Sequence, residues 1–123
     1  MRVRRVEKPW GYELLLARTD RYAGKMLFVC AGRRLSLQHH ARKDETLFLL
    51  AGEAVLLLGG LTAEPVPHRM ARDRSYRVRA GQRHRLEALT DARILEISTP
   101  EMEDVVRWED DYGRAPGAQG GPQ

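Results

Sequence analysis

Several features that define other classes of protein are scarce or missing in this chain of 123 residues. It has one cysteine, Cys30, which cannot form a disulfide within the chain and is expected to pack as a small apolar residue. No apolar run reaches the length of a membrane span, and the charged N-terminus lacks the apolar stretch of a signal peptide. These absences predict a cytoplasmic protein with no membrane partner.

Asparagine is absent altogether, and only three of the 21 basic residues are lysines. Abundant arginine and few thermolabile residues are typical of a thermophile, although biased genome composition gives the same pattern. The net charge is +4, but the arginines are interspersed with Asp and Glu. No basic arm and no platform of aromatic residues occurs, which argues against a nucleic-acid partner.

Short apolar runs bounded by turn residues dominate what is present. They indicate strands at residues 26–31, 35–39, 46–50, 54–58, 75–78 and 94–98. Glycines lie in the turns between them. Strands at this spacing, with no helical pattern separating them, predict an all-β sandwich or barrel rather than a parallel α/β sheet.

The pattern fits one domain, at residues 1–114. Apolar content of 42% and charged content of 31% are ordinary for a soluble globular protein. A short helix is expected around residues 99–106, which open with a Thr-Pro cap and carry an apolar stripe. Residues 115–123 contain only Gly, Pro, Ala and Gln and are expected to be a disordered tail.

Residues of metal-binding type alternate along one predicted strand and recur just after it. Side chains of a strand point to alternate faces, so Gln38 and His40 share one face and His39 points away. Glu45 lies at the start of the next strand, and His84 follows a glycine turn. The sequence therefore predicts one metal site with the ligands Gln38, His40, Glu45 and His84.

This donor set limits which metals fit. Two imidazoles, one carboxylate and one amide oxygen suit Zn²⁺ first, with Mn²⁺, Fe²⁺, Co²⁺ or Ni²⁺ as alternatives. Because there are no thiolate ligands, we expect an open site that leaves room for water or substrate rather than a closed structural zinc site. His39 and His68 are expected to be ordinary hydrogen-bonded or surface residues.

The spacing resembles the paired motifs of the cupin superfamily, Gly32-x-x-Leu-Ser-Leu-Gln-x-His-x-x-x-x-Glu45 and Gly81-x-x-His84. Gln38 in place of the usual first histidine is similar to the ligand set of phosphomannose isomerases. The segments Lys8-Pro-Trp-Gly-Tyr-Glu13 and Arg107-x-Glu-Asp-x-Tyr-Gly-Arg114 also resemble the isomerase domain of bifunctional mannose-6-phosphate isomerase/mannose-1-phosphate guanylyltransferases. Arg79 departs from this pattern, because a proline is usual there.

The resemblance implies a double-stranded β-helix, or jelly-roll barrel, that forms a homodimer and isomerises a sugar or sugar phosphate. Such a reaction needs a metal as Lewis acid, a base that carries a proton, and a grip on the phosphate. The candidate catalytic residues are Lys25 and Glu96. The candidate phosphate contacts are Arg34, Arg42 and Lys43, whereas Arg85 falls on the strand face opposite to its neighbour His84.

Two other functions remain open at this point. One is a non-catalytic cupin that binds a carbohydrate or metabolite and keeps the metal for ligand capture or structure. The other is a metal-dependent oxygenase, which Gln38 in place of histidine disfavours. The C-terminal motif is interpreted as structural, with Arg107, Asp110 and Arg114 forming an ion-pair cluster that holds the last segment against the barrel.

Overall fold

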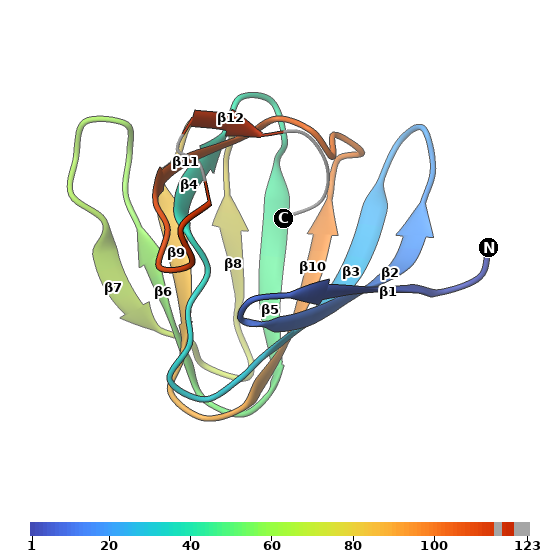
Figure 1. The fold of residues 1–123 in the computed structure, drawn as a ribbon, viewed down its shortest axis with the longest axis horizontal. Coiled ribbons are helices and arrows are strands. Elements are labelled where there is room, and N and C mark those ends of the chain that lie inside the picture. Colours follow the sequence, from blue (N-terminus) through green and yellow to red (C-terminus); the bar gives the residue numbers. More distant parts are fainter. Residues whose placement is uncertain (115–116, 120–123) are drawn as a thin grey trace.

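The computed structural model describes residues 1–114 and the backbone of residues 117–119. Within this part, twelve strands form two six-stranded antiparallel sheets that face each other (Figure 1). The part of the chain described contains no helix long and apolar enough to cross a membrane. The all-β jelly-roll prediction is therefore confirmed.

The two sheets are built from segments that are far apart in the sequence. The first sheet contains, in spatial order, β1 (Arg4–Lys8), β2 (Gly11–Arg18), β3 (Ala23–Val29), β10 (Ala92–Ser98), β5 (Glu45–Ala51) and β8 (Ser75–Val78). The second contains β12 (Gly117–Gln119), β11 (Val105–Glu109), β4 (Leu37–His40), β9 (His84–Ala88), β6 (Ala54–Leu58) and β7 (Val66–Arg69).

The short C-terminal helix predicted at residues 99–106 is wrong. No helix is formed there, and Val105 begins strand β11, which pairs antiparallel with β4. The apolar stripe of the expected helix is too short to offset the cost of nucleating one. The β-branched pair Val105 and Val106 instead favours an extended chain, with Val105 buried against the interior.

The tail predicted to be disordered, residues 115–123, lies outside the described residues apart from β12. The backbone of β12 pairs with Val105, Val106 and Arg107 of β11.

The space between the sheets has an apolar half and a polar half. Fourteen buried apolar residues pack in one cluster: Trp10, Leu27, Val29, Leu35, Leu47, Leu49, Ala54, Leu56, Met70, Val78, Leu86, Ala88, Ala92 and Ile94. Each large member contributes roughly 1.5–3 kcal/mol by leaving water. This half can hold the two sheets together without a bound ion, which leaves the polar half available for chemistry.

Candidate metal centre

Strand register brings the candidate ligands onto facing inner surfaces of the two sheets. On β4, Gln38 and His40 are buried between the sheets, and Gln38 lies directly opposite His84 of β9. Glu45 begins β5 in the other sheet and is also buried. His39 lies on the other face of β4, where Trp108 Nε1 donates a hydrogen bond to its Nδ1 at 2.9 Å.

Three of these residues gather their donor atoms at one point. His84 Nε2 lies 3.1 Å from Glu45 Oε1, and His40 Nε2 lies 3.8 Å from the same oxygen. One donor atom from each residue lies within 4.8 Å of the other two, and all three side chains are buried. A single ion can therefore contact His40, Glu45 and His84 at once.

A hydrogen bond to Nδ1 of His84 fixes which nitrogen of this ring faces Glu45. His84 Nδ1 lies 3.0 Å from the carbonyl oxygen of Gln82, so it carries the proton and leaves a lone pair on Nε2. That lone pair faces Glu45 Oε1, and no hydrogen bond joins the two among the described residues. Two acceptors this close repel each other unless a cation lies between them.

Asp104 supports the second histidine, and the sequence analysis missed it. Its Oδ1 lies 3.4 Å from His40 Nδ1, while its Oδ2 accepts backbone hydrogen bonds from Arg42 and Lys43 at 2.7 and 2.9 Å. A carboxylate behind a ligating histidine orients the ring and raises its basicity. Assigning residues 99–106 to a helix hid this role. In β11, Val105 pairs with His40, which brings the preceding Asp104 beside the ring.

The charge state of the group suits a divalent cation. Burial lowers the pKa of His40 to about 3, so its ring is neutral and can donate a lone pair. Burial alone would raise the pKa of Glu45, but the positive charge of Lys43 outweighs it and holds that pKa well below its usual range. Neutral imidazoles and an ionised carboxylate are the forms that bind Zn²⁺ or Mn²⁺, so the residues present fit a metal.

Gln38, the fourth predicted ligand, lines the wall of the same small cavity as Glu45, His84 and Glu96. Its Oε1 accepts a hydrogen bond of 3.3 Å from the hydroxyl of Ser36. The cavity has a volume of about 10 Å³, close to the space that one water molecule needs.

A chain of buried charges extends from the three ligands across the first sheet. Lys43 Nζ donates to Glu96 Oε2 at 2.8 Å and lies 3.3 Å from Glu45 Oε2. Glu96 pairs in register with Lys25, which in turn lies 3.5 Å from Glu13. Burial raises the pKa of Glu96, and Glu45 adds to this effect. The candidates Lys25, Lys43 and Glu96 are therefore all buried, and Lys43 directly contacts the ligand Glu45.

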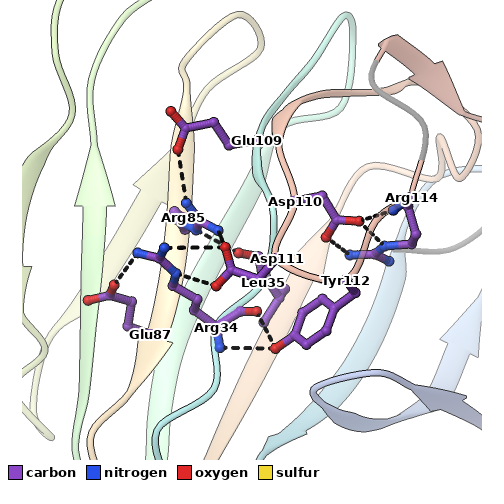
Figure 2. Close-up of polar contacts among 9 residues, drawn as sticks. All are labelled: Arg34, Leu35, Arg85, Glu87, Glu109, Asp110, Asp111, Tyr112 and Arg114. Atoms are coloured by element: carbon purple, nitrogen blue, oxygen red, sulfur yellow. Dashed lines mark hydrogen bonds and ion pairs between the residues drawn. The ribbon is translucent and has the colours of Figure 1, made fainter.

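The other predicted phosphate contacts lie away from this interior. Arg42 is on the surface. Arg34 and Arg85 are held on the outer face of the second sheet by Asp111, at 2.6 and 2.7 Å, in the network shown in Figure 2. Arg34 also forms an ion pair with Glu87, and Arg85 forms one with Glu109.

The C-terminal motif is only partly paired. Asp110 bonds the guanidinium of Arg114 through both oxygens, at 2.9 and 3.0 Å (Figure 2). Arg107, the third member of the expected ion-pair cluster, points inward beside Gln38 instead, and its Nε has no hydrogen-bond partner within residues 1–114.

The turn that leads into His84 is held without the proline that is usual there. Gly81 has a φ of 85°, which favours glycine, and its N–H donates to the carbonyl oxygen of His40 at 2.8 Å. The side chain of Gln82 accepts a hydrogen bond from the backbone of Arg79 at 2.7 Å. The first bond joins the turn directly to the ligand strand β4, and the second closes the turn on itself.

Comparison with known proteins bears on both fold and family. Residues 1–110 match the family model described as Mannose-6-phosphate isomerase C-terminal. The mannose-1-phosphate guanylyltransferase ManC of Salmonella typhimurium is 31% identical over 116 residues, covering 90% of this chain. The chain spans 23% of the length of that relative.

Solved structures agree on the fold at low sequence identity. The capsular polysaccharide assembling protein CapF of Staphylococcus aureus aligns with a TM-score of 0.70 at 19% identity, over 85% of this chain and 30% of that one. KdgF of a Halomonas species aligns with a TM-score of 0.69 at 17% identity, over 81% of this chain and 88% of that one. Oxalate decarboxylase of Bacillus subtilis, studied for its Mn(II) centres, aligns with a TM-score of 0.67 at 15% identity, over 80% of this chain and 27% of that one. All three have the cupin fold, and so does this chain.

Proposed function

Because the chain belongs to the mannose-6-phosphate isomerase C-terminal family, we propose that it is a metal-dependent isomerase that interconverts mannose 6-phosphate and fructose 6-phosphate. The observation that carries the proposal is the convergence of His40, Glu45 and His84 at one buried point, beside a small cavity that Glu45, His84 and Glu96 line. An aldose–ketose isomerase needs a Lewis acid and a proton carrier within reach of the same two carbons.

When bound by His40, Glu45 and His84, a divalent metal stabilises the negative charge that develops on the sugar oxygens. Zn²⁺ is the ion we propose first, on the mixed nitrogen and oxygen donor set, and Mn²⁺, Fe²⁺, Co²⁺ and Ni²⁺ remain alternatives. Gln38, beside the three ligands, supplies a fourth donor or orients a sugar hydroxyl.

Glu96 is the residue that we propose moves the proton between C1 and C2. Its Oε2 is held by Lys43, which leaves Oε1 to accept and return the proton. A pKa raised by burial brings a carboxyl closer to the pH at which it can do both. Lys43 keeps the carboxylate in place and offsets its charge between proton transfers.

The test follows the hydrogen at C2. Purified protein is loaded with each metal in turn, and exchange of the C2 hydrogen of mannose 6-phosphate with solvent deuterium is followed by NMR. We expect exchange with at least one metal, and we expect Glu96→Gln to abolish it while metal content stays the same. Glu53→Gln, an exposed partner of Arg69, is the matched control and should exchange normally.

Metal-loaded protein that binds the sugar phosphate but shows no exchange would reject the isomerase. A metal-containing carbohydrate-binding module would then be the remaining function.

We also propose that two copies associate through the outer face of the first sheet, in the cytoplasm. This face carries exposed apolar side chains, with Ile97 54% exposed and Leu50 44% exposed. Sedimentation should show a dimer, and Ile97→Glu should shift it to monomer, whereas Val66→Glu on edge strand β7 should not. A monomeric wild type would reject the dimer.

A further inference from the structure

The two oxygens of the Glu45 carboxylate face different partners. Oε1 lies 3.1 Å from His84 Nε2 and 3.8 Å from His40 Nε2. Oε2 lies 3.3 Å from the ammonium nitrogen of Lys43. A carboxylate can bind a metal through one oxygen or through both. Because the second oxygen already lies beside a cation, this geometry favours metal binding through Oε1 alone.

Lys43 is anchored at both ends, apart from its contact with Glu45. Its backbone N–H donates to Asp104 Oδ2 at 2.9 Å, and its Nζ donates to Glu96 Oε2 at 2.8 Å. The side chain is only 3% exposed. Hydrogen bonds between an ammonium group and a carboxylate are short and strong. Glu96 and Asp104 therefore hold Lys43 beside Glu45 Oε2.

The number of oxygens that Glu45 contributes decides how many positions at the metal stay free. Catalytic zinc sites use three protein ligands and keep a further position open. Glu45 gives such a site, with His40 and His84, only if one of its oxygens binds. If both oxygens bound, one position fewer would remain for a substrate oxygen.

A contribution to metal affinity does not explain why a lysine is present here. Its ammonium lies beside a ligand carboxylate in a buried group, and like charges in such a place repel with little screening. Lys43 therefore opposes the binding of a cation. Control of the direction of Glu45 does explain it, because that control needs a positive charge at Oε2.

We propose that Lys43 is a positioning residue that holds Oε2 of Glu45 away from the metal, so that Glu45 binds the ion through Oε1 alone and a coordination position stays free for substrate. This proposal rests on the metal centre of the proposed function and does not depend on the isomerase reaction. It adds a second role to Lys43, whose bond to Glu96 was described above.

The test compares crystal structures of zinc-loaded wild type, Lys43→Met and Lys43→Arg. In the wild type, we expect Oε1 within about 2.2 Å of zinc and Oε2 beyond about 3 Å. In Lys43→Met, Oε2 should move to within about 2.6 Å, the upper end of carboxylate coordination distances. Lys43→Arg retains a cation that can hold Oε2 and should restore the wild-type arrangement. Identical Glu45 coordination in wild type and Lys43→Met would overturn the proposal.

Zinc affinity gives a second readout, with a sign that general damage to the fold does not produce. Lys43→Met should bind zinc more tightly, by on the order of 10-fold, because it removes a repelling charge and frees a second donor oxygen. Competition titration against a chelating dye measures the change. Lower affinity in Lys43→Met would contradict the proposal, since it would mean that Lys43 only maintains the shape of the site.

Two further variants separate this role from the loss of a buried charge. Lys25→Met is the matched control, because Lys25 is equally buried but pairs with Glu13 at 3.5 Å. It should leave zinc affinity and the coordination of Glu45 unchanged. Lys43→Met with Glu96→Gln removes the charges of both bonded partners and guards against misfolding of the single variant. It should show the same move of Oε2, and the absence of that move would overturn the proposal.

Failure of this role and failure of the isomerase give different results. A wild type that binds zinc through Oε1 alone, with Oε2 released in Lys43→Met, supports the role even if no C2 exchange occurs. A wild type that exchanges the C2 hydrogen while both oxygens of Glu45 bind zinc rejects the role and keeps the isomerase. Protein that binds no metal rejects both.

Discussion

Two clusters of charged residues lie back to back across strand β9, and they differ in how completely they are paired. On the outer face, Arg34 and Arg85 make five side-chain bonds of 2.6 to 3.3 Å to carboxylates, three of them to Asp111 (Figure 2). On the inner face, buried atoms of Glu45, His84 and Arg107 have no hydrogen-bond partner among the described residues. Adjacent residues of one strand, His84 and Arg85, belong to the two clusters.

The difference separates structural charges from charges kept for a ligand. Leaving a buried polar atom unpaired costs roughly 1–3 kcal/mol, so unpaired atoms gather where something else binds. The outer cluster ties the segment after β11 to the sheet, and Tyr112 adds a hydrogen bond to the carbonyl of Arg34 at 2.9 Å. In the inner cluster, His40, Glu45 and His84 can hold a cation between their donor atoms.

The largest expected effect comes from removing an inner ligand. His40→Ala should lower metal affinity by more than about 100-fold, since it removes a direct ligand and even supporting residues are worth 10- to 100-fold. His39→Ala is a closely matched control, because the adjacent ring faces Trp108 on the outer side. Elemental analysis after dialysis measures both. Equal metal loss in the two variants would contradict the assignment of the inner face.

Metal removal should lower thermal stability without unfolding the protein. A ligand that binds only the folded state at about 1,000 times its Kd adds roughly 4 kcal/mol, which amounts to roughly 10 °C or more in Tm. The apolar half of the interior should keep the chelated protein folded. Differential scanning fluorimetry with and without chelator gives the shift, and complete unfolding on chelation would show that the inner cluster is structural.

Asp104→Asn tests the support behind His40. The amide keeps the shape but loses the charge that orients the imidazole, so metal affinity should fall by about 10- to 100-fold. Calorimetry with Zn²⁺ measures the change. Asp110→Asn, which affects Arg114 rather than a ligand, should leave metal affinity unchanged, and an equal fall in both would remove Asp104 from the metal centre.

Breaking the outer cluster should affect stability alone. Among the residues that the structure describes, Asp111→Ala leaves the buried guanidinium of Arg85 with only Glu109 and the carbonyl of Leu35 as partners. Because Asp111 is itself partly exposed, solvent screening keeps the expected loss to about 1–2 kcal/mol. Chemical denaturation measures this loss, and unchanged zinc affinity in the same variant is part of the prediction. A large loss of metal affinity would mean that the two clusters are not separate.

The smallest effect is the pH dependence of the outer cluster. Hydrogen bonds from Arg34 lower the pKa of Asp111 in the folded state. Its contribution to stability is therefore present above the unfolded pKa of about 3.9 and is lost as the pH falls through the lower folded value. The Tm difference between the wild type and Asp111→Asn should shrink below about pH 4. A difference that grows in acid would contradict the pairing.

The sequence predicted the parts of the site that depend on local alternation. Gln38 and His40 face inward because side chains alternate along a strand, and this holds wherever the strand lies. Asp104 was not predicted as a support of His40, since its position depends on the pairing between the distant strands β4 and β11. The apolar stripe around Val105 fits a short helix or a strand equally well, and only pairing with β4 decides between them.

The most direct test of the difference between the two clusters is a crystal structure of protein loaded with Zn²⁺, with anomalous diffraction data collected at the metal absorption edge. We predict one strong anomalous peak on the inner side of β9, about 2.0 to 2.2 Å from one donor atom each of His40, Glu45 and His84. No peak should occur at Asp111 or Glu109. An empty inner cavity with zinc bound to the outer carboxylates would contradict the account.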